Sequence, residues 1–316
     1  MRSRLVPLLT VITALAAVVF AIPRIFAAPS RPPPAHATLP PALSSYLGVF
    51  EEGAPPSYEP LDGFAMAAGR RPNLVGYFSG WAQPFDTSFA ELVSKHDGIL
   101  FVQIDPTLAS VAAIAAGSYD MYLRSYAASV RAYGKPVVIG FGHEMNGNWY
   151  AWSHVQPSVF VAAWKHIVTL FRKEGAENVT WIWTINAAGR PGIRPPVLWW
   201  PGDSYVTWVG IDGFYYRSSD TFRNIFAATI KEVRSFTARP VLLSETGVGP
   251  AAGQFGKILN LFNGMTKFRT LGLVWFDKKQ HAGLYHQDWR IEDDQGALAA
   301  FRLGVKDQLS PATAPR

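Results

Sequence analysis

Two glutamates stand at the ends of short apolar runs, in local settings that are much alike. The first run, Val137 to Phe141, is followed by His143 and Glu144, and about 100 residues later the run Val241 to Leu243 leads to Glu245. Apolar β-branched runs of this length are typical of buried strands, so each carboxyl group is expected where a strand gives way to a loop. Two carboxyl groups placed in this way can act as the acid and the nucleophile that cleave a glycosidic bond. The first stretch alone also fits a solvated loop glutamate, and the recurrence of the pattern favours the catalytic interpretation.

Aromatic side chains follow the first glutamate closely. Trp149, Tyr150 and Trp152 come shortly after Glu144, and the whole chain holds 11 Trp among 316 residues. Flat aromatic side chains offer broad apolar faces, on which the apolar face of a sugar ring can stack. This abundance of tryptophan exceeds what packing requires and indicates an aromatic-lined groove.

Short apolar runs alternate with helical patterns along the chain, which predicts βα units and a parallel sheet. A helix capped by Ser118 is expected to end at Gly134, and Pro157 suits the first turn of a helix that ends at Gly175. Eight strands with intervening helices in about 260 residues predict an α/β fold with a single (β/α)8 TIM barrel. The alternative is an open doubly wound sheet, but no Gly-rich phosphate loop follows any strand. The eight strands are predicted at residues 46–50, 74–78, 98–104, 137–141, 179–185, 206–211, 241–244 and 271–276.

The strand count places both glutamates at one end of this barrel. Glu144 follows the fourth predicted strand and Glu245 follows the seventh. Active-site residues of (β/α)8 barrels gather at the C-terminal ends of the strands, so the two carboxyl groups are expected to converge there.

Several motifs resemble those of glycoside hydrolase family 26, a family of (β/α)8 glycosidases typified by β-mannanases. The resemblance extends from about Tyr46 to Leu303 and implies the same barrel and a retaining mechanism. It is carried by His143 to Gly147 followed by Trp149, by Ser244 to Gly247, by Trp200 to Asp203, and by Val209 to Gly213.

The resemblance also implies roles for single residues. Glu144 corresponds to the general acid/base and Glu245 to the nucleophile, two tasks that require different pKa values. His143 is expected to reach the sugar ring next to the scissile bond, and Trp149 to lie beside the substrate. Trp275 corresponds to the tryptophan that stacks under the sugar at subsite −1. A packing role competes with the binding role for His143 and for both tryptophans.

The sixth strand departs from the family pattern. Family members usually carry a tyrosine that hydrogen-bonds the nucleophile, and Phe214 stands in that place here. Tyr215 is expected to serve instead, with Tyr216 as the alternative, and Asp212 is assigned a structural role.

Further residues at strand ends are candidates for lining the substrate groove. Tyr77, Trp81 and Asp277 follow or end predicted strands, so they are expected on the same face of the barrel as the glutamates, although each also suits loop packing. The histidines show no metal-ligand spacing, and the mechanism needs neither a metal nor another cofactor. None is predicted.

The N-terminal segment differs from the rest of the chain. Residues 1–28 combine early arginines with an apolar run at residues 5–22, which predicts a signal peptide or a membrane anchor. Residues 29–43 are rich in proline and are expected to form a linker, followed by a catalytic domain at 44–308 and a tail at 309–316. The product is therefore expected to be secreted or anchored outside the cytoplasm.

Net charge and cysteine content narrow the possible partners. The net charge of +6 falls to +2 without the four arginines that precede Glu51. The sequence contains no basic stripe with interleaved aromatic residues, so nucleic acid is not an expected partner. The chain contains no cysteine, so disulfides and thiolate metal sites are excluded. The expected partner is a polysaccharide or an oligosaccharide, and the protein is expected to be a monomer.

These observations predict a retaining endo-β-glycosidase, with β-1,4-mannan as the first substrate to test. A lichenase-like β-glucanase, a β-1,3-xylanase or an exopolysaccharide hydrolase would use the same fold. A carbohydrate-binding or polysaccharide-synthesis accessory barrel without catalysis is the alternative outside the enzymes, since Phe214 leaves it open.

Overall fold

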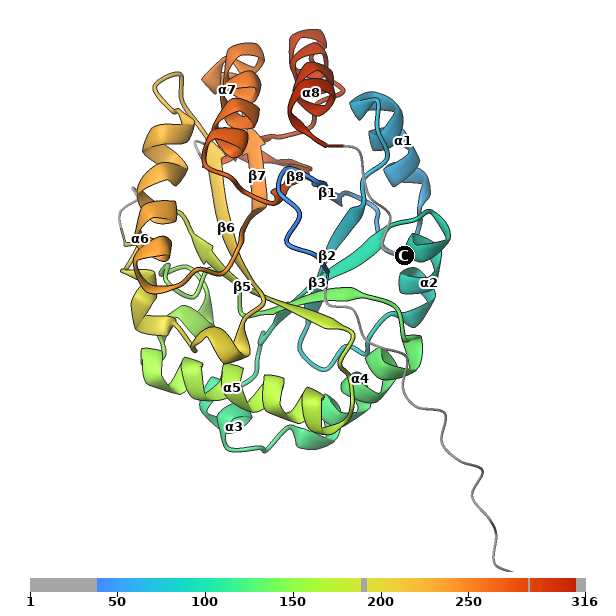
Figure 1. Ribbon diagram of the computed structural model, residues 1–316, viewed down its shortest axis with the longest axis vertical. Helices are drawn as coiled ribbons and strands as arrows, with labels where there is room; N and C mark the ends of the chain where they lie inside the picture. The colour runs from blue at the N-terminus through green and yellow to red at the C-terminus, as the bar shows by residue number, and fades with distance from the viewer. Residues whose placement is uncertain (1–38, 189–191, 284, 311–316) are drawn as a thin grey trace, which may run out of the picture. The chain divides into compact units, whose positions relative to one another are not determined.

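A computed structural model describes residues 39–188, 192–283 and 285–310 of the chain. Eight parallel strands, each hydrogen-bonded to the next and the last to the first, close a barrel (Figure 1). The predicted (β/α)8 barrel is confirmed. The strands are β1 (Tyr46–Glu51), β2 (Leu74–Gly80), β3 (Ile99–Asp105), β4 (Val137–Phe141), β5 (Val179–Asn186), β6 (Trp208–Tyr215), β7 (Val241–Val248) and β8 (Gly272–Asp277).

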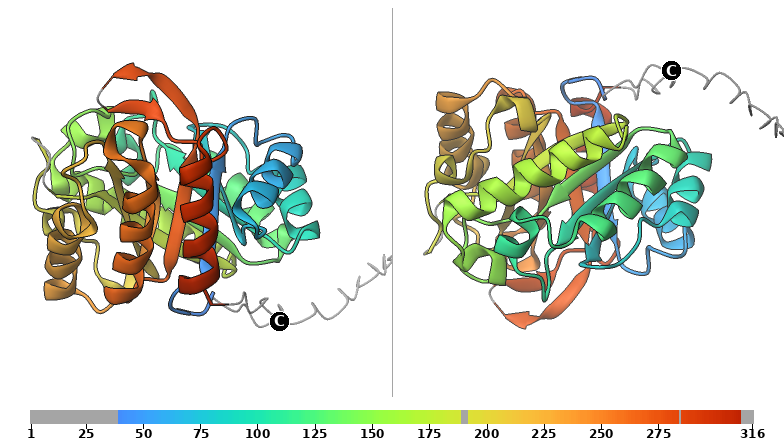
Figure 2. Two further views of the ribbon diagram at one scale, coloured as in Figure 1. Left: turned by 90° about the horizontal axis from the view of Figure 1, so that it is seen from above. Right: turned by 90° about the horizontal axis from the view of Figure 1, so that it is seen from below.

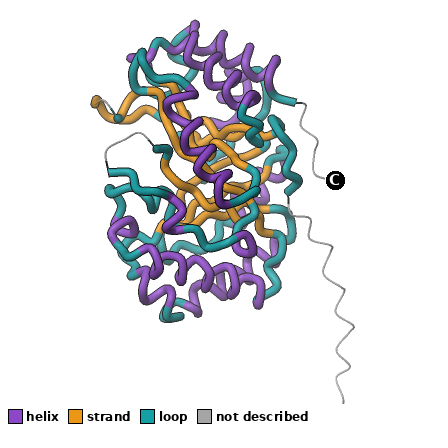
Figure 3. Tube along the Cα trace, turned by 60° about the vertical axis from the view of Figure 1, so that its left-hand side comes forward, coloured by secondary structure: helices purple, strands orange, loops and turns teal. Residues whose placement is uncertain are grey.

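Helices surround the strands on the outside of the barrel (Figure 3). The α-helices are α1 (Glu59–Ala68), α2 (Thr87–Lys95), α3 (Val111–Ala115), α4 (Asp120–Tyr133), α5 (Pro157–Lys173), α6 (Ala228–Phe236), α7 (Gln254–Lys267) and α8 (Gln295–Gln308). Short helical turns join them, namely η1 (Ala151–His154), η2 (Pro196–Trp199), η3 (Asp203–Tyr205), the π-helical η4 (Arg223–Ala227) and η5 (Pro250–Ala252).

Alternate side chains of each strand belong to two separate cores. In β6, Trp208 lies in the apolar cluster inside the barrel, whereas Val209 and Ile211 lie in the cluster between strands and helices. Successive side chains of a strand point to opposite faces, so both faces of a barrel strand are buried here and both are apolar. Polar side chains that face inward, such as Thr184 and Asp212, are buried above the apolar layers.

Several predicted boundaries differ by one or two residues from the observed ones, and three differences affect the site or have a clear cause. β6 continues to Tyr215 rather than ending at Ile211, and β7 continues to Val248, so Glu245 lies within its strand and not after it. The two strands stay paired along this extension, with Phe214 opposite Gly247. Helix α4 begins at Asp120, because Gly117 adopts a left-handed conformation (φ 83°) that turns the chain first.

Residues 39–43 pack against the barrel, although they were predicted as part of the linker. Leu39 is buried in the inner cluster, its backbone N–H donates to Thr180 Oγ1 at 3.2 Å, and Tyr46 Oη donates to the carbonyl of Pro40 at 2.7 Å. The predicted signal peptide or anchor at 1–28 lies outside the described residues. Within the described part of the chain, no helix combines the length and apolar character needed to cross a membrane.

A two-stranded hairpin follows β8 directly. It consists of β9 (Lys279–Gly283) and β10 (His286–Asp288), which pair antiparallel. Figure 2 shows this orange-red hairpin projecting beyond the end of the barrel. The hairpin therefore extends the barrel wall at the end where the predicted site lies.

Candidate active site

The loop after β4 turns sharply and thereby presents His143 and Glu144. Gly142 and Glu144 both adopt left-handed backbone conformations, with φ of 55° and 54°. The backbone N–H of Gly142 donates to the carbonyl of Ile104 on β3 (2.9 Å), and that of Glu144 donates to the carbonyl of Thr184 on β5 (3.0 Å). A left-handed conformation costs a residue with a side chain about 1 kcal/mol or more, and such strain is typical of functional sites. The neighbouring strands hold this strained turn in place.

The Glu144 carboxyl group is held by two donors. Trp149 Nε1 donates to Glu144 Oε2 at 2.7 Å, and Asn186 Nδ2 at the end of β5 donates to Oε1. The Glu144 side chain is nevertheless at the edge of a cavity of about 370 Å³. This carboxyl group is thus fixed in orientation and accessible to a ligand.

Glu245 lines the same cavity from β7. Within the described residues, no hydrogen bond to its carboxyl group is found. Burial and the charge of Glu144 raise the pKa of Glu245 to about 8, while the positive charges of His143 and Lys278 act in the opposite direction. The charge of Glu144 thus makes ionisation of Glu245 less favourable, and the two cations partly restore it.

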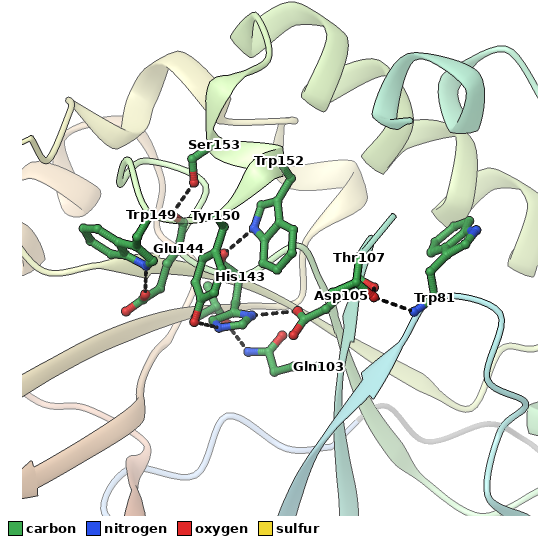
Figure 4. A network of polar contacts seen from close by, with 11 residues as sticks. Trp81, Gln103, Asp105, Thr107, His143, Glu144, Trp149, Tyr150, Trp152 and Ser153 are labelled. Atoms are coloured by element: carbon green, nitrogen blue, oxygen red, sulfur yellow. Dashed lines mark hydrogen bonds and ion pairs between the residues drawn. The ribbon is translucent and has the colours of Figure 1, made fainter. Parts of the chain in front are cut away.

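His143 joins a polar network next to Glu144 (Figure 4). Its Nδ1 lies 2.8 Å from Asp105 Oδ1 at the end of β3, and its Nε2 lies 3.1 Å from Tyr150 Oη. Burial alone would lower the pKa of His143, but the carboxylate of Asp105, with further contributions from Glu144 and Glu245, raises it to about 9. His143 is therefore an imidazolium at neutral pH and partly offsets the negative charge of the site.

Trp152 and Trp149 pack around this network and fix the loop that carries it. Trp152 Nε1 donates to the carbonyl of His143 at 2.7 Å, and the Trp152 ring stacks on Tyr150 with 4.4 Å between ring centroids. Trp149 lies over Gly147, where an added Cβ would come within 2.6 Å of the indole ring. A glycine is thus required at 147 for Trp149 to reach Glu144.

Arg194, in the segment between β5 and η2, holds the loop from Gly142 to Ser153 by hydrogen bonds to its backbone. Its guanidinium Nη2 donates to the carbonyls of Met145 (3.4 Å), Gly147 (3.3 Å) and Ser153. The same group lies 4.3 Å from the ring centroid of Trp199. The planar fork of arginine suits such multiple contacts, so Arg194 fixes the backbone that carries Glu144.

Three residues predicted to bind substrate lie on the outer face of their strands instead. Tyr215 is fully buried and its Oη donates to Asn260 Oδ1 on α7 (3.2 Å), a position that does not fit the predicted role. Trp275 packs edge-on against Phe301 of α8, with 5.0 Å between centroids. Tyr77 packs against Phe89 of α2 in the same way.

The residue next to each of these three faces the inside of the barrel, where the substrate-binding residue was expected. Phe214 lines the cavity of Glu144 and Glu245, and Phe276 belongs to the inner cluster with its ring 5.7 Å from that of Phe214. Phe78 lies in the same inner layer, 5.2 Å from the His143 ring. Phenylalanines therefore stand where the family resemblance implied a tyrosine and a tryptophan.

Asp277 and Trp81 also lie away from the cavity. Asp277 is buried between β1 and β8, where it accepts a hydrogen bond from the backbone of Ile291 at 3.1 Å. Burial and the charges of Glu292 and Glu51 raise the pKa of Asp277 to about 10, so this carboxyl group is neutral at pH 7. Trp81 packs against Tyr119, just before α4, and Tyr122 in α4, on the far side of Asp105 from Glu144 (Figure 4).

Several residues of the site were missed in the sequence, among them Asn186, which contacts Glu144 without lining the cavity. Asn186 ends β5 with a polar side chain, and its place at a strand end was a usable signal. The hairpin residues offered no such signal, because the antiparallel β9–β10 insertion departs from the βα alternation. The cavity residues that it contributes are Gln280, Tyr285, His286 and, just after it, Trp289.

The site offers acid/base and nucleophilic chemistry from carboxyl groups. Among the described residues, no group of three or more His, Cys, Asp or Glu side chains is arranged to hold a metal ion. Asp212 lies beneath the pair, directly opposite Glu245 in the β6–β7 register. Burial, followed by the charges of Glu245 and Glu144, raises its pKa well above the ordinary value.

A closed (β/α)8 barrel with two glutamates in one cavity at the C-terminal ends of its strands defines a glycosidase-like barrel. The chain belongs to glycosyl hydrolase family 26, since the sequence model of that family matches residues 121–302.

Two relatives are similar in sequence. Endoglucanase H of Acetivibrio thermocellus is 28% identical over 271 residues, which cover 80% of this chain. The β-1,3-xylanase TXYA of a Vibrio species is 24% identical over 189 residues, which cover 57% of this chain. The matches span only 29% and 34% of these relatives' own lengths.

Solved structures of mannanases share the fold. The Bacillus subtilis mannanase BCman superposes with a TM-score of 0.61 at 19% identity, covering 84% of this chain and 85% of that one. A Cellulomonas fimi endo-β-1,4-mannanase gives a TM-score of 0.65 at 16% identity, covering 86% and 76%. At these identities the likeness concerns the fold alone.

Proposed function

We propose that the protein is a retaining endo-β-glycosidase that cleaves a β-linked polysaccharide. The observation that carries this proposal is the convergence of Glu144 and Glu245 on one cavity, in a chain of family 26. Trp149 and Trp289 line the same cavity and offer aromatic surface to a sugar ring.

The two carboxyl groups divide the reaction between them. Glu245 attacks the anomeric carbon while Glu144 gives its proton to the glycosidic oxygen, so the C–O bond breaks and a glycosyl ester forms on Glu245. In the second step Glu144 takes a proton from water, the water oxygen attacks the same carbon, and the Glu245 carboxylate leaves. His143, as an imidazolium, favours the ionised form of Glu245 throughout.

β-1,4-Mannan is the substrate that we propose first, because several solved structures with this fold are named as mannanases. A β-glucan is the second candidate, and the similarity to Endoglucanase H over 80% of the chain favours it. Phe214, which lines the cavity, and Phe276, which packs against Phe214, differ from the residues that the mannanase resemblance implied.

A panel of polysaccharides tests this proposal. The release of reducing ends from mannan, glucomannan, lichenan and β-1,3-xylan should be strong for one backbone, and proton NMR of early products should show retained β configuration. A rapid fall in viscosity relative to reducing-end release would indicate internal cleavage. Absence of hydrolysis on every backbone would instead support a non-catalytic carbohydrate-binding barrel.

We also propose that the chain is exported, because early arginines precede an apolar run at residues 5–22. Fractionation of cells that produce the full chain should place it outside the cytoplasm, either released or held at the membrane. Recovery of the full-length chain from the cytoplasm would refute export.

The protein is proposed to act as a monomer, which sedimentation analysis would test.

A further inference from the structure

A second cavity adjoins the catalytic one. It has a volume of about 400 Å³, which is within the range of roughly 300–1,000 Å³ that is usual for ligand pockets. Phe214, Tyr216 and Tyr285 line both cavities, so the two share a wall. A polysaccharide bound at Glu144 and Glu245 would therefore carry its next unit, or a substituent, into this second cavity.

The second cavity is formed by the ends of β5 and β6 and the start of η4. Its polar residues include Asn186, Asn224, Asp220 and Arg217. The catalytic cavity contains the carboxyl groups of Glu144 and Glu245, so a cation in the adjoining cavity favours the binding of an anionic ligand there. The charge of Arg217 is the feature that distinguishes this cavity from the catalytic one.

Arg217 is exposed, and within the described part of the chain its guanidinium makes no ion pair and no hydrogen bond. Asp220 is close in sequence, but its Oδ2 accepts hydrogen bonds from the backbone N–H groups of Tyr216 (2.7 Å) and Arg217 (2.8 Å). The carboxylate of Asp220 thus stabilises the turn instead of neutralising the side chain of Arg217. Arg194, by contrast, is engaged with three backbone carbonyls.

We propose that this second cavity is a subsite for an acidic unit of the polysaccharide, recognised by Arg217. The proposal rests on the proposed function, since it specifies the substrate class of the same groove. A guanidinium binds a carboxylate through two parallel N–H···O hydrogen bonds, a geometry that neutral hydroxyl groups do not match. Without such a cation, the carboxylates of Glu144 and Glu245 would repel an anionic chain.

The acidic group has two chemical sources, a uronic acid in the chain or an acid-bearing substituent on a neutral sugar. Both present a carboxylate to Arg217. Two derivatives of one polymer separate them, namely glucomannan oxidised at C6 to uronate units and glucomannan that carries succinyl half-esters. The unmodified glucomannan serves as the neutral reference.

The test compares wild-type protein with Arg217→Ala and Arg217→Lys. Binding is measured by titration calorimetry with the Glu245→Ala background, so that turnover does not interfere, and kcat/KM is measured with intact Glu245. Arg223→Ala is the matched control, because Arg223 is exposed and close in sequence but lines neither of the two cavities. It removes the same charge from the same region.

We expect wild-type protein to bind at least one acidic polymer more tightly than neutral glucomannan. Arg217→Ala should weaken that binding about tenfold, as is usual for the loss of a charge-assisted pair, and leave neutral glucomannan within about twofold. Arg217→Lys should recover part of the loss, and Arg223→Ala should change neither.

Three results would overturn the subsite: no preference for either acidic polymer in wild-type protein, equal losses on acidic and neutral polymers in Arg217→Ala, or the same loss in Arg223→Ala. Because binding is measured apart from turnover, failure of hydrolysis on all polymers would contradict the proposed enzymatic function without deciding the role of Arg217. The binding result decides that role in every case.

Discussion

Phe214 stands at the inner end of β6 and lines the cavity together with Glu245. A tyrosine in this place would add a phenol hydroxyl on the side of the nucleophile, and a hydrogen bond to a carboxylate favours its ionised form. The charges of His143 and Lys278 are what lowers the pKa of Glu245 in this protein. In this protein the pKa of Glu245 is therefore set by burial and by neighbouring charges, without a hydrogen bond from residue 214.

The substitution Phe214→Tyr should lower the pKa of Glu245 from about 8. The acidic limb of the kcat/KM profile, which reports ionisation of the nucleophile in the free enzyme, should move to lower pH by about one unit. A pH profile of wild type and variant measures this. Tyr215→Phe is the control, since Tyr215 lies on the outer face of β6 and should leave the limb where it is. An unmoved limb in Phe214→Tyr would show that the side chain at 214 does not face the nucleophile.

His143 owes its positive charge to Asp105. Removal of that charge in Asp105→Asn leaves burial to act, so the pKa of His143 should fall from about 9 by at least one unit. The imidazolium favours ionised Glu245, so the alkaline limb of kcat/KM should shift to lower pH in parallel.

Two measurements check this, the pH profile of kcat/KM and NMR titration of the His143 ring. Asp120→Asn is a matched control, because Asp120 pairs with His166 at 2.6 Å on the outer helices, away from the site. If the alkaline limb stays in place in Asp105→Asn while the NMR titration shifts, the charge of His143 has no part in turnover.

At the scale of elements, the loop from Gly142 to Ser153 carries Glu144, the proposed acid, and is held by Arg194. Loss of the guanidinium in Arg194→Met leaves three carbonyls without their donor, and the strained conformation of Glu144 loses its support. Because small displacements of a catalytic group are costly, kcat should fall about 10- to 100-fold with a smaller change in KM.

Arg234→Met is the control for a general loss of stability. Arg234 also donates to loop carbonyls, those of Phe268 and Arg269, but lies on α6 away from the cavity. Steady-state kinetics with melting curves for both variants make the comparison. Equal effects of the two variants on kcat at equal loss of Tm would refute a positioning role for Arg194.

The seam between β1 and β8 contains a second group of carboxyl side chains, Glu51, Asp277 and Glu292. Burial raises the pKa of Asp277 to about 10 and that of Glu51 to about 7. The folded state thus holds protons on Asp277 and Glu51 that the unfolded chain releases, so the contribution of these two groups to the free energy of unfolding is fully present at low pH and is lost as pH rises toward 10.

Asp277→Asn should flatten that decline, since an amide does not titrate. Melting temperatures at pH 6 and pH 9.5 measure the effect, and the difference between them should shrink in the variant. Asp307→Asn, an exposed position on α8, should keep the wild-type difference. A steeper decline in Asp277→Asn than in wild type would contradict the assignment.

At the scale of the whole molecule, the barrel followed from the order of apolar runs and helical patterns in the sequence. The structure brings Glu144, Glu245 and Trp149 to one cavity with His143 beside them, as the predicted order of the strands implies. The predicted positions of Tyr77, Tyr215 and Trp275 failed for one shared reason. Both faces of a barrel strand are apolar, so the sequence does not tell which of two adjacent aromatics points inward.

In each case the inward residue is the neighbour: Phe78 for Tyr77, Phe276 for Trp275, and Phe214 or Tyr216 for Tyr215. A shift of one residue along a strand exchanges its faces, and only closure of the barrel decides the register. The hairpin residues were missed because β9 and β10 are an insertion, and Arg194 because its role depends on carbonyls distant in sequence.

The central claim is the division of labour between Glu144 and Glu245. An aryl glycoside with an acidic phenol releases its phenolate without protonation by the enzyme. Glu144→Ala should therefore spare the first step on this substrate, and the glycosyl ester on Glu245 should accumulate. Glu245→Ala removes the attacking atom, so turnover should collapse for every leaving group. On polysaccharide, Glu144→Ala should lose activity by about 10²- to 10⁴-fold.

The most direct measurement is rescue of the two variants by azide on such an aryl glycoside, with NMR of the glycosyl azide formed. Azide needs no deprotonation, so it should restore turnover in Glu144→Ala and give a product of retained β configuration. Rescue of Glu245→Ala with that same β-azide product, or identical behaviour of both variants, would contradict the assignment of acid/base to Glu144 and nucleophile to Glu245.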